Sequence, residues 1–375
     1  GEIISMDESP LWHNIIWVGT DDGNVQVSKD GGKNWTEVSR NIYDLPSGSY
    51  VSRVKASKQG RGTAYVTFDR HREGDWAPYI YRTDDYGKTW KNLSAGLPSG
   101  SINVVLEHPD NPNVLFLGTE HHIFVSINSG GDWVQFKSNL PTTLYDDMVI
   151  HPREKDLILG THGRSFWVLD DTTPIAEWHD SANKDLHIFS VRPATLFHYW
   201  KDTSYRGQEE WAGPNPEYGA LIHFVSNSFR DSALVTIRQR DKVIRTENIA
   251  FTSGAINRYV WNLKHPPPPF TRNDRQREGL TKPDRSELLP IPPHDLDPQG
   301  PHVSPGNYTV TITVGGQSQT QKVKVLADPK LDLRTGDYRQ REKFLLEVHA
   351  LHRQTYSVNN VLLEDIKKME ESFDK

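Results

Sequence analysis

The sequence contains no cysteine among its 375 residues, which excludes disulfide bonds, thiolate catalysis and cysteine-ligated metal sites. It also lacks an apolar run of about 18 residues, the length that a membrane-spanning helix needs. Neither sign of charge dominates, because 43 Lys and Arg residues stand against 49 Asp and Glu residues, for a net charge of −6. This mild acidic excess gives no electrostatic reason to expect nucleic acid or an anionic membrane as a partner.

A short polar turn followed by tryptophan occurs three times in the first part of the chain. The three octets read "SKDGGKNW" from residue 28, "TDDYGKTW" from residue 83 and "SINSGGDW" from residue 126. Their spacing is close to the length of one blade in a propeller of four-stranded sheets. The flanking segments repeat as well, since "WVGTDDG" (17–23) resembles "FLGTEHH" (116–122). The repeats therefore predict a mainly β chain that begins with propeller blades.

The copies predict three full blades and one partial blade within residues 1–180. Closed propellers typically have four to eight blades, so we expect an incomplete wheel. The missing blades would come from upstream sequence or from another chain. The opening segment "GEIISMDESP" has neither an initiator Met nor the features of a signal peptide. We therefore expect a processed or excised piece, from which an upstream signal could have been lost.

The repeats stop after about residue 180, and the pattern changes twice. Short alternating strands, ending in the hairpin around Gly315-Gly316, predict an Ig-like β-sandwich over 181–328. A proline-rich insertion is expected at 264–305. Apolar residues at three- and four-residue steps predict one or two helices within the last segment, 329–375.

The octet at 83–90 resembles the Asp-box, or BNR repeat, of sialidase-like and sortilin-like propellers. It matches at Thr83, Asp85, Gly87, Thr89 and Trp90. The chain as a whole resembles the C-terminal portion of bacterial secreted proteins of the glycosyl-hydrolase-like or sortilin-like family. That resemblance implies a secreted, periplasmic or cell-surface location in a bacterium.

Turn chemistry alone accounts for each residue of the octets. Glycine permits positive φ, aspartate or asparagine accepts hydrogen bonds from the turn, and tryptophan buries its ring between blades. We therefore predict structural roles rather than catalytic ones for nine octet residues. These are Asp30, Gly32, Trp35, Asp85, Gly87, Trp90, Asn128, Gly130 and Trp133.

The turns on the opposite face of the blades are the preferred place for a ligand. They span 20–24, 68–76, 119–122 and 161–165, and they are rich in ionisable residues. Glycoside hydrolysis needs two carboxyl groups, and Asp22 and Glu120 are the candidates for that pair. The candidate ligand-binding residues are Asp21, Arg70, His71, His121, His162 and Arg164. The plain alternative is that these residues form solvated, hydrogen-bonded turns.

Several other activities have no support in the sequence. The histidines lack metal-ligand spacing, and the adjacent His121 and His122 would point apart on a strand, so no metal is expected. No phosphate-binding or dinucleotide-binding glycine loop is present, so no cofactor is expected. Among the candidate ligand-binding residues only Arg70 and Arg164 are arginines, whereas sialidases need a cluster of three.

Two hypotheses about function follow. The first is a secreted glycoside-hydrolase-like protein that binds or hydrolyses carbohydrate at the face opposite the octets. The second is a non-catalytic sortilin-like subunit that recognises a protein or peptide. The acidic turns favour the first, whereas the open propeller and the apolar stripe of the last segment favour the second.

Overall fold

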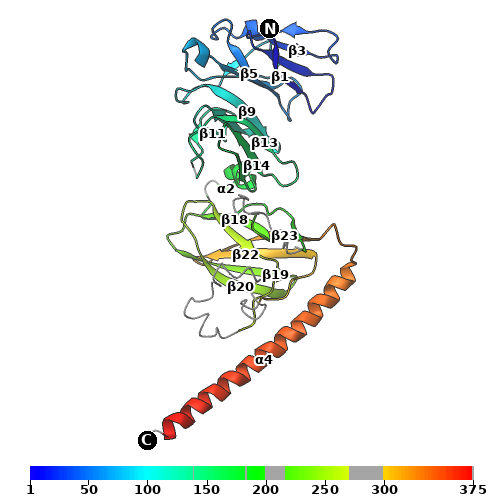
Figure 1. Cartoon of the computed structure of the whole chain (residues 1–375), viewed down its shortest axis with the longest axis vertical. Coiled ribbons are helices and arrows are strands. Elements are labelled where there is room, and N and C mark those ends of the chain that lie inside the picture. The colour runs from blue at the N-terminus through cyan, green and yellow to red at the C-terminus, as the bar shows by residue number, and fades with distance from the viewer. Residues whose placement is uncertain (138, 182–183, 199–215, 270–298, 374–375) are drawn as a thin grey trace, which may run out of the picture. The chain divides into compact units, whose positions relative to one another are not determined.

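The computed structural model describes residues 1–375 except 138, 182–183, 199–215, 270–298 and 374–375. Contacts between Cα atoms divide the chain into two compact units, residues 1–182 and residues 183–375. The middle of the proline-rich segment and most of the aromatic loop that precedes Tyr218 lie outside the described residues. The prediction of a mainly β chain with propeller blades is confirmed (Figure 1).

The first unit consists of four antiparallel sheets in chain order. The first three have four strands each and the fourth has three. The blades are β1 (Ile3–Glu8), β2 (Ile16–Thr20), β3 (Val25–Ser28) and β4 (Thr36–Glu37); β5 (Tyr50–Ala56), β6 (Ala64–Asp69), β7 (Tyr79–Thr83) and β8 (Lys91–Asn92); β9 (Ile102–His108), β10 (Asn111–Thr119), β11 (Ile123–Ser126) and β12 (Val134–Gln135); and β13 (Tyr145–Ile150), β14 (Leu157–Thr161) and β15 (Phe166–Leu169).

Apolar cores form between successive blades rather than within one blade. Trp17 and Val27 of the first blade share a core with Val54 of the second. A second core joins Tyr65 to Leu115 across the next boundary, and a third lies between the third and fourth blades. A blade therefore buries both of its faces only when it has a neighbour on each side. Two short helices, α1 (Thr173–Ala176) and α2 (Trp178–Ser181), follow the fourth blade.

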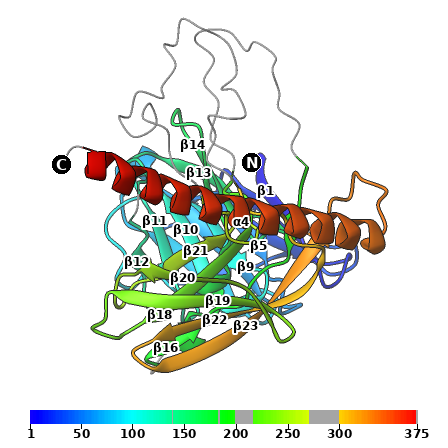
Figure 2. The same cartoon turned by 90° about the horizontal axis from the view of Figure 1, so that it is seen from below.

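The second unit contains two sheets around one core, followed by a helix. The three-stranded sheet has the order β16 (Leu186–Ile188), β18 (Ala220–Ser226) and β21 (Asn257–Trp261). The five-stranded sheet has the order β17 (Ala194–Leu196), β23 (Gln317–Ala327), β22 (Gly306–Val314), β19 (Ser232–Gln239) and β20 (Lys242–Ala250), and Figure 2 shows β19, β22 and β23 side by side. The six strands expected from alternation are present, and the Ig-like topology stays a prediction.

One helix, α4 (Thr335–Phe373), spans 39 residues at the end of the chain (Figure 1). Its first turns are anchored, because Tyr338 lies in the sandwich core and Glu342 accepts hydrogen bonds from the Ser304 backbone N–H and from His265. Further along, the predicted apolar stripe is exposed to solvent. Its exposed members include Val348, Leu351, Leu362, Ile366 and Met369.

Candidate functional site

The octets are closed hairpin turns between the third and fourth strands of the first three blades. In the second octet, Thr83 Oγ1 donates to Asp85 Oδ1 at 2.9 Å and accepts from the Gly87 N–H at 2.9 Å. Asp85 Oδ1 also accepts from the Thr89 N–H at 2.9 Å. The same set of bonds joins Ser28, Asp30, Gly32 and Asn34 in the first octet, and Ser126, Asn128, Gly130 and Asp132 in the third.

These bonds fix the ionisation of the octet aspartates. The Asn34 side chain and backbone donate to Asp30 and lower its pKa to about 2. Burial pushes the pKa of Asp85 upward, but hydrogen bonds from Thr89 outweigh it, and the net shift is downward. A carboxylate held ionised in this way stabilises a turn and is poorly suited to deliver a proton near neutral pH.

Two of the octet tryptophans bind the preceding blade, and one does not. Trp90 Nε1 donates to the Val38 carbonyl at 3.1 Å, and Trp133 Nε1 donates to the Leu93 carbonyl at 2.8 Å. Trp35 instead donates to Gly32 of its own turn at 3.0 Å and is 41% exposed. Within the described residues no blade precedes Trp35, so its burial between blades stays a prediction.

The four turns that join the second and third strands lie on one face of the blades. They are connected by the segments that lead into the first, or inner, strand of each blade, which are β1, β5, β9 and β13. Arg70 of the second turn donates to Ser49 Oγ at 3.0 Å, and Gly23 of the first turn packs closely against the Ser49 backbone. The Gly100 N–H donates to the Trp76 carbonyl at 2.7 Å, and the Glu120 N–H donates to the Ser101 carbonyl at 3.1 Å. Thr143 links the last two turns through His121 O and His162 O. The turns thus form one continuous row.

In the first turn, the two aspartates hold local structure. Asp21 Oδ1 accepts from the Glu2 N–H at 2.6 Å. Asp22 Oδ1 accepts from Thr20 Oγ1 at 2.5 Å and from Asn24 Nδ2 at 3.0 Å. The Thr20 hydrogen bond is the main reason that the pKa of Asp22 lies below its usual value. Asp22 is therefore kept ionised by its own turn.

The second turn contains two ion pairs and an exposed aromatic ring. Arg70 Nε lies 3.1 Å from Asp75 Oδ2, and His71 Nδ1 lies 2.5 Å from Asp69 Oδ2. Hydrogen bonding by the Ala77 N–H lowers the pKa of Asp75. Trp76 is 43% exposed, and its ring centroid lies 6.0 Å from that of His71.

The third and fourth turns differ in how their side chains are used. Glu120 Oε2 is buried and has no hydrogen-bond partner among the described residues. His121 and His122 lie in a turn rather than on a strand, and their rings meet edge to face at 6.3 Å, which corrects the expectation that they point apart. His162 lies 3.5 Å from Asp146, whereas Arg164 is exposed and offers its backbone carbonyl to Trp167.

The predicted catalytic carboxylates lie in the turns of different blades. Asp22 is bonded within the first turn and to Gly1, whereas Glu120 lies two blades further on, beside Ser101. In the described part of the chain, no hydrogen bond or ion pair links the two residues.

The first strand of each blade has a register shift opposite the end of the second strand, at a Gly-Thr pair in the first, third and fourth blades and at Thr67-Phe68 in the second. The shifted residues are Ile4, Ser52, Asn103 and Asp146. A β-bulge re-aims side chains and is often found beside functional sites. We call Ser52, Arg53, Asn103, Glu120, Asp146 and Asp147 the bulge rim.

Arg53 connects distant parts of the bulge rim. Its guanidinium donates to the Asp146 carbonyl and to Asp147 Oδ1, each at 3.1 Å, from the second blade to the fourth. Its Nε and the Nδ2 of Asn103 are buried and have no partner among the described residues. Sequence reasoning missed these residues because a bulge depends on strand pairing. The available signal was a polar residue early in the first strands of the second, third and fourth blades.

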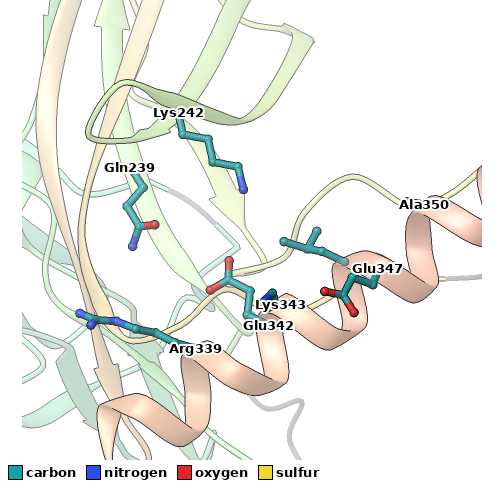
Figure 3. A pocket seen from close by; sticks show the side chains of 8 residues that line it. Gln239, Lys242, Arg339, Glu342, Lys343, Glu347 and Ala350 are labelled. Atoms are coloured by element: carbon teal, nitrogen blue, oxygen red, sulfur yellow. The ribbon is translucent and has the colours of Figure 1, made fainter.

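Two cavities are lined by residues outside the bulge rim. One of about 430 Å³ lies between the β19–β20 hairpin and α4, lined by residues such as Lys242, Arg339 and Glu347 (Figure 3). Another, of about 130 Å³, lies beside Trp12 and Tyr86. Within the described residues, no group of three or more His, Asp or Glu side chains is arranged to hold a metal ion. The described helices include none that is long and apolar enough to cross a membrane.

Part of the chain is similar to known proteins in sequence. A family model named Sortilin-Vps10, described as sortilin, neurotensin receptor 3, matches residues 78–188. The vacuolar protein sorting/targeting protein 10 of Laccaria bicolor is 27% identical over 116 residues, which are 30% of this chain. The chain spans only 7% of the length of that relative.

Several solved structures are also similar to this chain. A GH74 enzyme of Niastella koreensis has a TM-score of 0.37 and 18% identity, covering 45% of this chain and 29% of that one. YCF48 of Cyanidioschyzon merolae has a TM-score of 0.30 and 20% identity, covering 46% and 57%. A structure of YCF48 bound to D1 peptide has a TM-score of 0.31 and 14% identity, covering 60% and 64%.

Proposed function

We propose that residues 1–182 are a non-catalytic binding segment of a propeller, and that the bulge rim recognises a protein or peptide partner. The observation that carries this proposal is that hydrogen bonds from Thr20 and Asn24 hold the predicted catalytic carboxylate Asp22 inside its own turn. The sortilin family, whose model matches residues 78–188, is described as a receptor, and this favours binding over hydrolysis.

The chemistry of glycoside hydrolysis argues against a catalytic pair here. The two carboxyl groups must lie about 5–9.5 Å apart across one sugar, and the acid needs a raised pKa. The pKa of Asp22 is lowered by the Thr20 hydrogen bond, which is the opposite of what a general acid needs.

The bulge rim offers the groups that a peptide backbone requires. Arg53 Nε and Asn103 Nδ2 are donors without partners among the described residues, and Glu120 Oε2 is an acceptor without one. A bound peptide presents carbonyl and N–H groups in alternation, and the Arg53 side chain, which is 29% exposed, offers a donor to them. Asp147 adds an exposed negative charge beside Arg53, which suits a basic side chain on the partner.

Carbohydrate binding without hydrolysis is the second candidate, because of one observation. Trp76 lies on the same face and is 43% exposed, so its ring is free to stack against a sugar. We expect a secreted, periplasmic or cell-surface location whether the ligand is a peptide or a carbohydrate. Fractionation of the source cells would test this location.

The proposal is tested by selecting peptides from a random display library on the 375-residue chain. We expect selected peptides to lose at least about tenfold in affinity, or roughly 1.4 kcal/mol, on the Arg53→Met variant. The matched control is Arg61→Met, because Arg61 instead stacks on Trp12, away from the bulge rim. Its affinity should equal that of the parent.

A hydrolysis assay on polysaccharides provides the opposing outcome. If the parent releases reducing sugar and both Asp22→Asn and Glu120→Gln abolish that release, the protein is a glycoside hydrolase and the proposal is wrong. If selected peptides bind Arg53→Met and Arg61→Met equally well, the bulge rim is not the binding site.

A further inference from the structure

The larger cavity of the second unit is lined by three positively charged side chains. It has a volume of about 430 Å³ and lies between the β19–β20 hairpin and the first turns of α4 (Figure 3). Lys242 reaches into it from the hairpin, and Arg339 and Lys343 line it from the helix. Within the described residues, none of these three side chains has a hydrogen bond or an ion pair. A space of this size suits a small molecule rather than a lone ion.

The two acidic side chains of this cavity are used differently. Glu342 holds the helix to the sandwich, because its Oε1 lies 2.8 Å from His265 Nε2 and its Oε2 accepts from the Ser304 N–H at 2.9 Å. Glu347 is exposed, and among the described residues it has no hydrogen-bond or ion-pair partner. Three cations therefore face two carboxylates, one of which already serves the fold.

A neutral donor with a fixed orientation lies beside these cations. Tyr308 donates to the Ser304 carbonyl at 2.7 Å, so its oxygen accepts from Gln239 Nε2, which lies 3.0 Å away. This orients the Gln239 amide and leaves its second Nε2 hydrogen for another acceptor. Burial raises the pKa of Tyr308, and the charge of Arg339 opposes that rise, which shows that the guanidinium lies near the same phenol.

We propose that this cavity binds a small organic phosphate. A phosphate group has several acceptor oxygens, so the Arg339 fork can bind two of them while Lys242 and Lys343 act as point charges. A carboxylate has fewer oxygens and less charge, and it would leave part of this donor set unused. Leu346 and Ala350 line the same cavity and would contact the organic part of the ligand. The proposal does not depend on what the bulge rim binds.

The test measures the binding of phenyl phosphate, inorganic phosphate and benzoate to the 375-residue chain by titration calorimetry at pH 7.5 and low salt. Phenyl phosphate should bind most tightly, since it alone combines a doubly charged phosphate with an apolar ring. We expect Arg339→Met to weaken its binding at least about tenfold, and Lys242→Met about three- to tenfold. Lys324→Met is the matched control, because Lys324 is an exposed lysine of β23 that does not line the cavity. It should bind like the parent.

Replacement of Glu347 should change the affinity in the opposite direction. Glu347→Gln removes a carboxylate that repels the bound anion, so it should tighten phenyl phosphate binding about two- to threefold. A variant that only disturbed the fold would not bind more tightly. Absence of phenyl phosphate binding at millimolar concentration, or equal losses in Arg339→Met and Lys324→Met, would overturn the proposal. Equal binding of inorganic phosphate, or tighter binding of benzoate, would overturn the organic phosphate as the ligand.

Discussion

The first octet and the second octet have almost the same sequence, yet their tryptophans lie in different surroundings. Trp90 reaches the Val38 carbonyl of the blade before it, whereas Trp35 folds back on Gly32. Hydrogen bonds inside the two turns match. The octet therefore closes its own hairpin through its internal hydrogen bonds. Docking between blades is a separate property that requires a neighbouring blade.

Replacement of the docked tryptophan is expected to have the largest effect. Trp90→Ala removes a ring from the core between the first and second blades and leaves the Val38 carbonyl without its donor. We expect a loss of about 3–4 kcal/mol in the free energy of unfolding. Trp35→Ala should cost less than about 1 kcal/mol. Urea unfolding of both variants measures these losses. Equal losses of unfolding free energy would contradict the difference between Trp90 and Trp35.

The next largest effect should be on the pH dependence of stability, because His108 is buried in the turn that it forms with Pro109. His108 Nδ1 accepts from the Asp110 N–H at 3.2 Å, Nε2 lies 3.1 Å from Thr172 Oγ1, and burial lowers the pKa of His108 from 6.5 to about 4. The unfolded chain therefore takes up the proton first as the pH falls. Stability from His108 is complete above pH 6.5 and is lost progressively down to about pH 4.

The expected loss over this pH range is at most on the order of 3 kcal/mol. His108→Gln should flatten the slope of unfolding free energy against pH between these limits. His151 occupies the equivalent turn of the fourth blade, where its Nδ1 accepts from the Glu154 N–H but the ring is less buried. The matched control is His151→Gln, and an equal change of slope in the two variants would contradict the assignment to His108.

The octet glycines give a smaller and more selective contrast. Gly87 and Gly32 have φ values of 78° and 87°, so alanine costs about 1–2 kcal/mol of backbone strain at either position. At Gly87 the new Cβ would also meet Val38 at 2.7 Å, which adds about 1–2 kcal/mol of overpacking. Gly87→Ala should therefore destabilise more than Gly32→Ala in thermal unfolding. A larger destabilisation by Gly32→Ala would show that Val38 does not pack tightly against Gly87.

The sequence predicted those features that repeat locally. The octets at 28, 83 and 126 indicated the blades, and their turn bonds follow from the residue types at Thr83, Asp85 and Gly87. The helix in the last segment and the strands of the second unit followed from apolar periodicity.

Features that depend on neighbouring strands could not be predicted in this way. The exposure of Trp35 reflects which blade lies beside it, and the register shifts at Ser52, Asn103 and Asp146 arise from pairing with the second strand. Asp22 and Glu120 are similar acidic turn residues in the sequence, and only the fold shows that hydrogen bonds hold one in place and leave the other with a buried oxygen.

The central claim is that the two ends of the blades have different tasks, with octets that hold the blades together and a bulge rim that binds a partner. The most direct measurement compares peptide affinity and unfolding free energy in Asp85→Ala and Arg53→Met, with a peptide selected on the parent chain. The account predicts that Asp85→Ala loses about 1–2 kcal/mol of stability at unchanged affinity. Arg53→Met should instead lose about tenfold in affinity at nearly unchanged stability. Loss of binding in Asp85→Ala, with binding intact in Arg53→Met, would contradict it.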